Sequence, residues 1–438
     1  MGLKDEAAGI VRRLQEAGRV AYFAGGCVRD ELLGRTPKDY DVATDATPEA
    51  VMALFPKTAP VGVQFGVVRV VTDAGDVEVA TFRSDGPYRD GRHPETVVFT
   101  DAEHDASRRD FTVNAMFFDP VTGRLLDYCG GQDDLARKVI RAVGDPRARF
   151  EEDRLRVLRA VRFAAGLGFE MDAGTASAVR EFAPRLAEVA WERIRDEIIK
   201  LLTGPGARRG LELMETTGLL IVALPEVAAT RGVPQPPEFH PEGDVWVHTL
   251  MLFDHLVDPP PELAVASLLH DIGKPPTLTV KERIRFDGHM EGGAEMARVV
   301  CARLRLSSDQ TDIITELVRD HLRFKDVRQM KESTLKRFLR VPHFDWHLEL
   351  HRVDCLACHG DLSNWEFCRA RLAEFARADA AQALRPKPLL RGEDLIALGH
   401  APGPRFKEIL TAVEDAQLEG GVSTRDEAVA LVKGRFPC

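Results

Sequence analysis

The sequence lacks three features that would each define a class of protein. Its seven cysteines are an odd number scattered along 438 residues, which argues against a disulfide framework. No apolar run reaches membrane-spanning length, and the N-terminal stretch has an amphipathic helix pattern without the apolar core of a signal peptide. Positive charge is not in excess either, since the formal net charge is −10, so any contact with a nucleic acid must come from local basic patches. We therefore expect a cytoplasmic protein with no membrane partner.

The length is enough for two to four domains, each with its own core. Short strand patterns and helix patterns alternate at the start of the chain, and helical periodicity takes over afterwards. A proline-rich polar stretch at 231–244 is expected to connect two of the helical domains. The predicted domains are an α/β domain at 1–145 and three all-α domains at 146–230, 240–378 and 385–438, which makes the protein mostly helical.

The most informative stretch runs from Tyr22 to Thr44 and reads YFAGGCVRDELLGRTPKDYDVAT. If KDYDV is a strand, Asp39 and Asp41 lie side by side on one face, because successive strand side chains alternate. Two carboxylates fixed in this way make a hard-oxygen site for Mg²⁺, which usually shares its ligands with substrate phosphates. The strand-like segment DVEVATF adds Glu78 as a candidate third carboxylate.

Ahead of the carboxylates lies a short glycine motif. Gly25 and Gly26 let the backbone approach a triphosphate, and Arg29 can grip it. Together with the carboxylates, this motif indicates nucleotidyl transfer, in which two metals activate an incoming hydroxyl and stabilise the departing pyrophosphate. A surface hairpin with solvated acids is the simpler alternative.

This arrangement resembles the head of the polymerase-beta nucleotidyltransferase superfamily, and most closely the class II tRNA nucleotidyltransferases and their bacterial poly(A) polymerase relatives. The resemblance implies a polymerase-beta-like α/β head with Asp39 and Asp41 as catalytic metal ligands. It also implies that Gly25, Gly26 and Arg29 contact the nucleotide triphosphate. The helical domains that follow would then be the neck, an HD domain and a tail.

The segment SRRDFTVNAMFFD, from Ser107 to Asp119, places charged and amide side chains ahead of an apolar strand. Such groups are costly beside a buried strand unless they bind something, although a salt-bridged turn is an alternative. The matching family motif implies contacts with the sugar and phosphates of the nucleotide. The residues concerned are Arg108, Arg109, Asp110 and Asn114.

Residues 150–169, FEEDRLRVLRAVRFAAGLGF, predict one helix with a buried stripe and a charged face that carries Asp153, Arg156 and Arg159. Solvated salt bridges are the plain interpretation of this face. A carboxylate beside a guanidinium can also read bases. Cytosine and adenine each present an amino donor next to a ring-nitrogen acceptor, whereas uracil and guanine present a carbonyl next to an N–H on the corresponding edge. The pattern EDxxRxxR, starting at Glu152, resembles the protein template of class II enzymes and implies Asp153 and Arg156 as the base-reading pair.

Two further segments match family motifs. WERIRDEIIKLL is expected to support the template helix through Glu192, Arg193 and Glu197. The polar segment at 83–99 matches the flexible loop that this family uses to reorganise the site between C and A addition, with Asp90 and Arg92 as its working charges. A full loop at this position favours terminal A addition.

A second constellation of histidines and aspartates lies between Val245 and Asp361. An adjacent His-Asp pair inside an apolar helix, with further His and Asp later, suits a divalent metal, and the mixture does not select among Mn, Fe, Ni, Zn and Mg. The order of these residues resembles the HD phosphohydrolase superfamily, which implies metal-dependent attack on a phosphoester; an inert remnant is the alternative. The resemblance assigns one metal to His248, His270, Asp271 and Asp354, and a second to His289 and His321.

CLACH, from Cys355 to His359, matches a haem-attachment pattern only superficially, because it lies in a probable helix of a chain without an export signal, and we expect no haem. In the last domain, Gly392 precedes one short helix, and a Gly-Pro run precedes the next, which carries Arg405 and Lys407. Such helix N-termini can hold a phosphate, and the segment resembles the tRNA-binding tail of some family members. A plain packing module is the alternative.

Taken as a set, the motifs identify a CCA-adding tRNA nucleotidyltransferase with a fused HD domain, which would use CTP, ATP and Mg²⁺ on the tRNA 3′ end. Bacterial poly(A) polymerase is the nearest alternative, but the basic run expected of it is missing from Val61 to Val68. An enzyme that adds only A or only CC, and an RNA-binding regulator on a transferase scaffold, are further alternatives.

Overall fold

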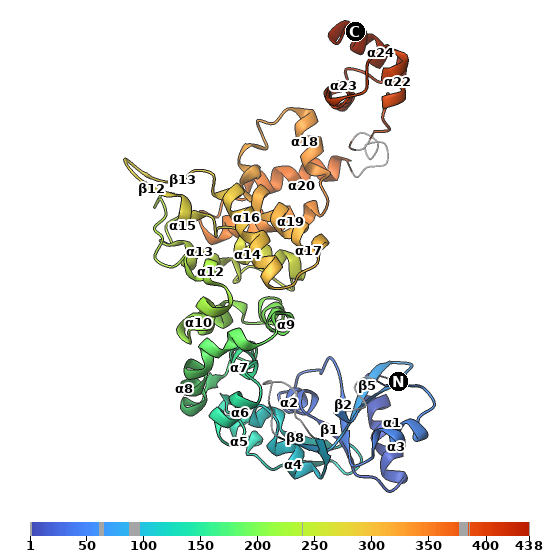
Figure 1. Ribbon diagram of the computed structural model, residues 1–438, viewed down its shortest axis with the longest axis vertical. Helices are drawn as coiled ribbons and strands as arrows, with labels where there is room; N and C mark the ends of the chain where they lie inside the picture. The colour runs from blue at the N-terminus through green and yellow to red at the C-terminus, as the bar shows by residue number, and fades with distance from the viewer. Residues whose placement is uncertain are drawn as a thin grey trace. The chain divides into compact units, whose positions relative to one another are not determined.

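The computed structural model describes residues 2–60, 65–86, 97–238, 240–375, 384 and 386–437 (Figure 1). The chain divides into two compact units, Met1–Ala228 and Ala229–Cys438. This division falls next to the predicted boundary at 230, while the other predicted boundaries stay predictions. The predicted class is confirmed, because an α/β head is followed by helical regions.

A seven-stranded sheet forms the centre of the head, in the order β3, β4, β5, β2, β1, β8, β9 (Figure 1). Strands β2 and β5 run parallel, and the other neighbours are antiparallel, so the sheet is mixed. The strands are β1 Ala21–Ala24, β2 Asp41–Thr44, β3 Thr58–Ala59, β4 Val67–Thr72, β5 Gly75–Thr81, β8 Met116–Asp119 and β9 Arg124–Asp127. A separate hairpin pairs β6 (Arg83–Asp85) with β7 (Val97–Phe99).

Helices pack on this sheet because their apolar residues recur at helical spacing. Helix α1 (Leu3–Glu16) buries Ile10, Val11 and Leu14 and contacts β1 and β2. Phe82 and Phe117 meet in the core edge to face, with ring centroids 5.8 Å apart. The other helices of the head are α2 Gly26–Leu32, α3 Pro48–Leu54, α4 Ala102–Ser107 and α5 Gly131–Arg137.

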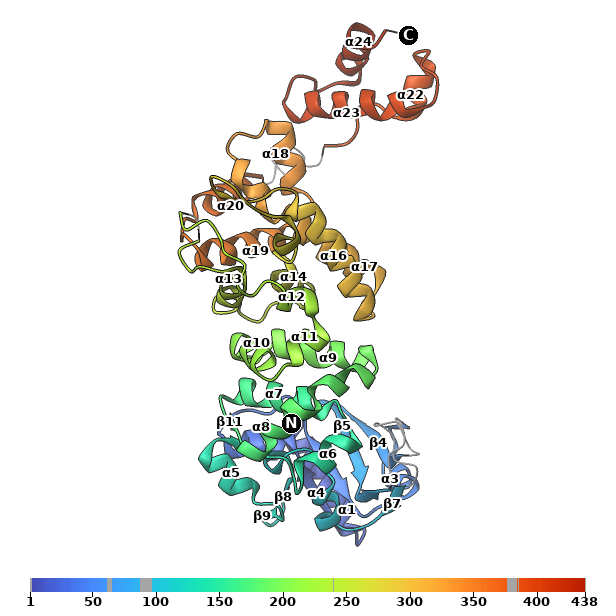
Figure 2. The same ribbon diagram turned by 60° about the vertical axis from the view of Figure 1, so that its left-hand side comes forward.

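The rest of the first unit is almost entirely helical. Its helices are α6 Pro146–Glu152, α7 Arg156–Leu167, α8 Ala173–Phe182, α9 Trp191–Leu202, α10 Ala207–Thr216, α11 Leu219–Ala223 and α12 Pro225–Ala228. Helix α7 contacts both α9 and α10, which fixes the position of its charged face (Figure 2).

Two local predictions were wrong. The predicted single helix at 150–169 is broken between α6 and α7: Asp153 is extended, and its Oδ1 accepts a hydrogen bond from the Leu155 N–H at 3.1 Å. This local side-chain bond replaces helical pairing at the joint. The predicted strand KDYDV is also shorter, because β2 begins at Asp41 and Asp39 lies outside it, two residues before the strand.

The second unit is a helical assembly around α14 (Pro261–Leu269), in which Leu263 to Leu269 are all buried. Helices α16 (His289–Arg303) and α17 (Ser308–Asp320) lie side by side (Figure 2). The remaining elements are α13 Val245–Leu252, α15 Lys274–Thr277, β12 Leu278–Val280, β13 Ile284–Phe286, α18 Glu332–Leu339, α19 Phe344–Ala357, α20 Ser363–Phe375, α22 Gly392–Ala397, α23 Pro404–Leu418 and α24 Arg425–Arg435.

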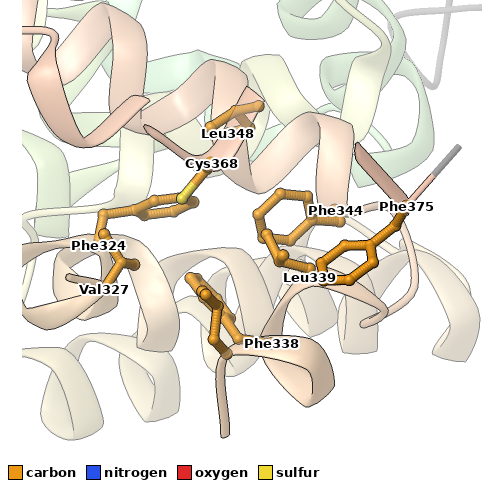
Figure 3. Packing of buried hydrophobic residues seen from close by; sticks show 9 residues of the cluster. Phe324, Val327, Phe338, Leu339, Phe344, Leu348, Cys368 and Phe375 are labelled. Atoms are coloured by element: carbon orange, nitrogen blue, oxygen red, sulfur yellow. The ribbon is translucent and has the colours of Figure 1, made fainter. Parts of the chain in front are cut away.

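An aromatic cluster joins α18, α19 and α20 (Figure 3). Phe338 lies between Phe324 and Phe344, with ring centroids 4.9 and 5.2 Å away, and Phe375 closes the cluster. Helix α18 also contacts α23, and Lys336 Nζ of α18 donates a hydrogen bond to the Leu418 carbonyl of α23 at 2.6 Å. The last helices are therefore attached to the same unit as the histidines.

Among the described residues, no helix is both long enough and apolar enough to cross a membrane. The six cysteines of that part of the chain are free thiols.

Candidate active site and candidate metal centre

A pocket of about 580 Å³ in the first unit gathers most of the predicted nucleotide-site residues. Four segments far apart in sequence contribute to it: the glycine turn before α2, the start of β2 with the residues before it, the segment after α4, and α7 with the joint before it. The lining residues are Gly25, Gly26, Arg29, Asp39, Asp41, Arg108, Arg109, Asp110, Asn114, Asp153, Arg156, Arg159, Arg162 and Phe163.

The predicted carboxylates meet at one edge of this pocket. Asp41 pairs in register with Glu78 on the parallel strand β5, and Asp39 and Asp41 both line the pocket with exposed side chains. The surrounding protein atoms, together with the charges of Asp39 and Glu78, raise the pKa of Asp41 to about 6. Glu78 lies beside the pair but does not line the pocket, and it faces Arg69 at 3.9 Å.

The negative charges of Asp39 and Glu78 beside Asp41 favour a cation at this site. The donor set is oxygen only, which matches the preference of Mg²⁺. Asp39 and Asp41 therefore fit a magnesium ion that is shared with a bound triphosphate.

Gly25 lets the chain turn tightly into this pocket. Its φ is +75°, a conformation that strains any residue with a Cβ, and an added Cβ would lie 3.0 Å from Arg109. The backbone can therefore come close to a bound phosphate here.

A chain of charged contacts forms the floor of the pocket. Arg29 donates to Asn114 Oδ1 at 2.6 Å, and Asn114 Nδ2 donates to Asp110 at 3.2 Å. Arg159 donates through two nitrogens to Asp110 Oδ2, at 2.9 and 2.6 Å. Burial alone would raise the pKa of Asp110, but the Arg159 guanidinium outweighs it and holds that pKa below its ordinary value.

The second unit brings the predicted metal ligands together. Three histidines have Nδ1 beside the main-chain carbonyl three residues earlier: His270 at 2.8 Å, His289 at 2.7 Å and His321 at 2.6 Å. A carbonyl oxygen only accepts, so each Nδ1 carries the proton and each Nε2 keeps its lone pair. All three rings are thus prepared to bind a metal through Nε2.

The Nε2 atoms of these three histidines and of His248 converge on the carboxylates of Asp271 and Asp354. His248 Nε2 lies 2.9 Å from Asp354 Oδ1, and His270 Nε2 lies 3.1 Å from Asp271 Oδ2. The other oxygen of Asp271 faces His321 and His289, at 3.7 and 3.9 Å from their Nε2 atoms. The six predicted residues thus form two ligand groups, His248–His270–Asp354 and Asp271–His289–His321.

Electrostatics and unsatisfied atoms fit divalent metal ions in these groups. Within the part of the chain that the structure describes, Asp271 Oδ1 and His289 Nε2 are buried without a hydrogen-bond partner. Burial lowers the pKa of His321 to about 4, which keeps that ring neutral. Burial opposes the charge on His248, but Asp354 and a second acid, Glu242, outweigh it and raise the pKa of His248 to about 9.

Comparisons with known proteins match both units of the chain. The family described as "Poly A polymerase head domain" matches residues 21–141, that described as "Probable RNA and SrmB- binding site of polymerase A" matches 168–230, and the HD domain matches 244–341. The CCA-adding enzyme of Geobacillus stearothermophilus is 49% identical over 216 residues, 49% of this chain and 53% of that protein. The CCA-adding enzyme of Leuconostoc mesenteroides is 46% identical over 209 residues, 48% of this chain and 52% of that protein. The matched region thus spans about half the length of these curated relatives.

A solved structure extends the match to nearly the whole chain. The crystal structure of the Bacillus stearothermophilus CCA-adding enzyme in complex with CTP superimposes with a TM-score of 0.74 and 31% identity, covering 98% of this chain and 97% of that one. The chain belongs to the family of CCA-adding enzymes. A structure of the Thermotoga maritima CCA-adding enzyme complexed with tRNA shares the fold, with a TM-score of 0.58, 18% identity and coverage of 98% and 94%.

In a CCA-adding enzyme, Asp153 and Arg156 are the expected base readers, and the structure places both at the pocket. Arg193 of α9 holds both oxygens of Asp153, at 3.1 and 2.7 Å. Arg156 donates to Glu152 at 2.8 Å and to the Arg108 carbonyl at 3.0 Å. Arg193 thus makes the expected supporting contact, and Glu197 does so through Arg162 at 2.6 Å.

Sequence reasoning missed three groups at this pocket. Asp105, which is 1% exposed, holds Arg108 at 2.6 Å and Arg109 at 3.0 Å; its spacing of three and four residues from them on a helical segment was an available signal. Arg162 and Phe163 line the pocket one turn beyond Arg159. The Phe163 ring is half-buried.

The remaining predicted residues lie elsewhere. Asp90 and Arg92 fall outside the described residues. In the tail, Gly392 and Lys407 line a cavity of about 680 Å³, whereas Arg405 does not line it and donates to the Pro437 carbonyl at 3.2 Å. The tail residues are thus only partly brought together.

Proposed function

We propose that this chain adds C and A to the 3′ end of tRNA, from CTP and ATP, by nucleotidyl transfer at the pocket of the first unit. The observation that carries the proposal is the meeting of Asp39 and Asp41 with a floor of arginines in one pocket. When bound, Mg²⁺ would lower the pKa of the attacking hydroxyl and offset the charge that develops on the leaving pyrophosphate. A cytoplasmic location is part of the same proposal.

Each part of the pocket has a separate task in this proposal. Arg29, Arg108 and Arg109 bind the triphosphate oxygens, and the turn at Gly25 leaves room for them. The Phe163 ring lines the pocket with the guanidinium of Arg162 4.1 Å from its centroid, and the base would stack on this aromatic–guanidinium pair. Asp153 and Arg156 read the edge that cytosine and adenine share.

We also propose that the second unit is a metal-dependent phosphohydrolase. The convergence of four Nε2 atoms on Asp271 and Asp354 supports it. A divalent ion there would supply a nucleophile at neutral pH and polarise the phosphoester. The two ligand groups fit two ions, and their mixture of nitrogen and oxygen donors does not select the element.

The decisive experiment uses pure protein and a tRNA transcript that ends at the discriminator base, incubated with each NTP alone and with CTP and ATP together. We expect CC from CTP alone and CCA from the mixture. A long A tail from ATP alone would indicate a poly(A) polymerase. Addition of A only to tRNA ending in CC, or of CC only, would indicate one half of a split system, and no addition would favour an RNA-binding regulator.

A further inference from the structure

The proline-rich stretch that the sequence marks as a connection folds into a closed loop in the second unit. Pro234 and Asp244 form an antiparallel bridge, the Gln235 N–H donates to the Gly243 carbonyl at 3.1 Å, and the Val245 N–H donates to the Val233 carbonyl at 3.1 Å. These bonds close a loop from 233 to 244, which we call the closed loop. It precedes almost all of the matched HD region, which starts at 244.

The closed loop reaches the metal centre at two points. Gln235, which is 3% exposed, accepts a hydrogen bond from Lys274 Nζ at 2.6 Å, and that ammonium lies 2.7 Å from Asp271 Oδ2. Glu242 carries a carboxylate that is 4% exposed, with Oε1 at 2.8 Å from the Nδ1 atoms of both His240 and His248. A carboxylate buried this deeply is costly unless it has a partner of opposite charge or a donor.

His248 differs from the other three histidines of the centre in what its Nδ1 faces. His270, His289 and His321 use carbonyls of their own chain segments, three residues back. His248 faces Glu242 instead, whose Oε1 lies 2.8 Å from Nδ1. A carboxylate at Nδ1 places the proton there, leaves Nε2 as the ligand atom and makes the imidazole a stronger donor to a metal.

We propose that Glu242, on the closed loop, is a positioning residue of the metal centre. It holds the His248 ring so that Nε2 can bind a divalent cation. The inference rests on the metal centre proposed above. It makes the closed loop part of the centre, since one of its side chains orients a ligand and another holds the ammonium beside Asp271.

The test measures Mn²⁺ binding by calorimetry on the full chain carrying Asp39→Ala and Asp41→Ala, which silences the head site, after removal of bound metal with a chelator. In this background, we expect Glu242→Gln to weaken Mn²⁺ binding about 10- to 100-fold. Glu238→Gln is the matched control, because Glu238 lies on the same loop and is exposed, and we expect its affinity to be unchanged. The melting temperature with chelator should be the same for all three chains.

Five results would overturn the inference. If Mn²⁺ affinity is unchanged in Glu242→Gln but lost in His248→Ala, the metal centre is supported and Glu242 has no part in it. A lower melting temperature with unchanged affinity indicates a structural role only, and an equal loss in Glu238→Gln indicates a general effect of the loop. If Glu242→Gln lowers both the Mn²⁺ affinity and the melting temperature, Glu242→Asp, which keeps the negative charge, decides. Affinity that stays low in Glu242→Asp overturns the inference, and restored affinity supports it. If the parent chain has no Mn²⁺ site that is lost in His248→Ala, the metal centre and the inference are overturned together.

Discussion

The nucleotide pocket and the metal centre both use carboxylates, yet they hold them in opposite ways. Asp39 and Asp41 are exposed at the edge of an open pocket, whereas Asp271 is 2% exposed and surrounded by imidazole nitrogens. Open oxygen ligands suit an ion that enters with the substrate, and a closed set of nitrogen and oxygen ligands suits a resident ion. Under the functions proposed above, burial and donor type would separate a shared metal from a retained one within a single chain.

Loss of the head carboxylates should have the largest effect. We expect Asp39→Ala or Asp41→Ala to reduce transfer of both C and A at least a thousand-fold, about 4 kcal/mol, because the shared metal loses its protein ligands. tRNA binding should stay largely intact. Asp73→Ala, at an acid whose side chain is 96% exposed, is the control. Single-turnover rates decide, and a residual rate above about 10% would contradict the assignment.

The independence of the two sites can be tested from the other side. His270→Ala should lower metal-dependent hydrolysis of a 2′,3′-cyclic phosphate end roughly 100-fold or more, since a ligand of the resident ion is lost. CCA addition should remain nearly unchanged, because the pocket belongs to the first unit. If a folded His270→Ala variant lost CCA addition to the same extent as hydrolysis, the two sites would not be independent.

Base choice should respond to a smaller change. Arg156→Ala removes the donor to the ring nitrogen of C and A, so discrimination against UTP should fall roughly 10- to 100-fold, as expected from 1–3 kcal/mol per unsatisfied group. The measurement is kcat/KM for the four nucleotides on tRNA ending at the discriminator base. Arg180→Ala, at an exposed position of α8, is the control. Lower thermal stability with unchanged ratios would instead show that Arg156 is only part of a salt bridge.

The smallest expected effect is a difference in acid sensitivity. Burial lowers the pKa of His347 and of His351 to about 4, so in the second unit each contributes stability that is complete above about pH 6.5 and is lost as the pH falls towards 4. In the first unit, Asp105 and Asp110 are also buried, but their arginine partners lower their pKa values, so their contribution is lost only below about pH 4. At pH 5.5, His347 and His351 should each have cost the second unit about 1.4 kcal/mol, while Asp105 and Asp110 should have cost the first almost nothing.

Thermal unfolding at pH 7.5 and 5.5, with chelator present and with each unit followed separately, measures this difference. His351 stacks on Phe324 with ring centroids 4.4 Å apart, so His351→Phe keeps a stacked ring at this position and should reduce the acid sensitivity. His359→Gln, at an exposed position, should leave it unchanged. Equal loss in both units would contradict the assignment.

The sequence predicted the fold class, and it named nearly every residue that lines the pocket. Strand alternation placed Asp39 beside Asp41, whereas in the structure Asp39 lies before β2 and outside it, so the residue was right and the reason was not. The break at Asp153 was missed because the helical pattern does not show that its carboxylate accepts from the Leu155 N–H and from Arg193, which lies 40 residues away. Glu242 was missed for the same reason: in the sequence it is one acid in a polar proline-rich stretch, and only the closure of that stretch brings it to His248.

The central sheet of the head has one more consequence, for self-association. Its two outermost strands are β3, which spans only Thr58–Ala59, and β9, which spans Arg124–Asp127 and carries a charge at each end. An edge strand exposes unpaired backbone groups on which another chain can build, and shortness and charge both weaken that template. The head should therefore resist edge-to-edge aggregation at the high concentrations of an expression host, and lengthening β3 with β-branched residues would remove that protection.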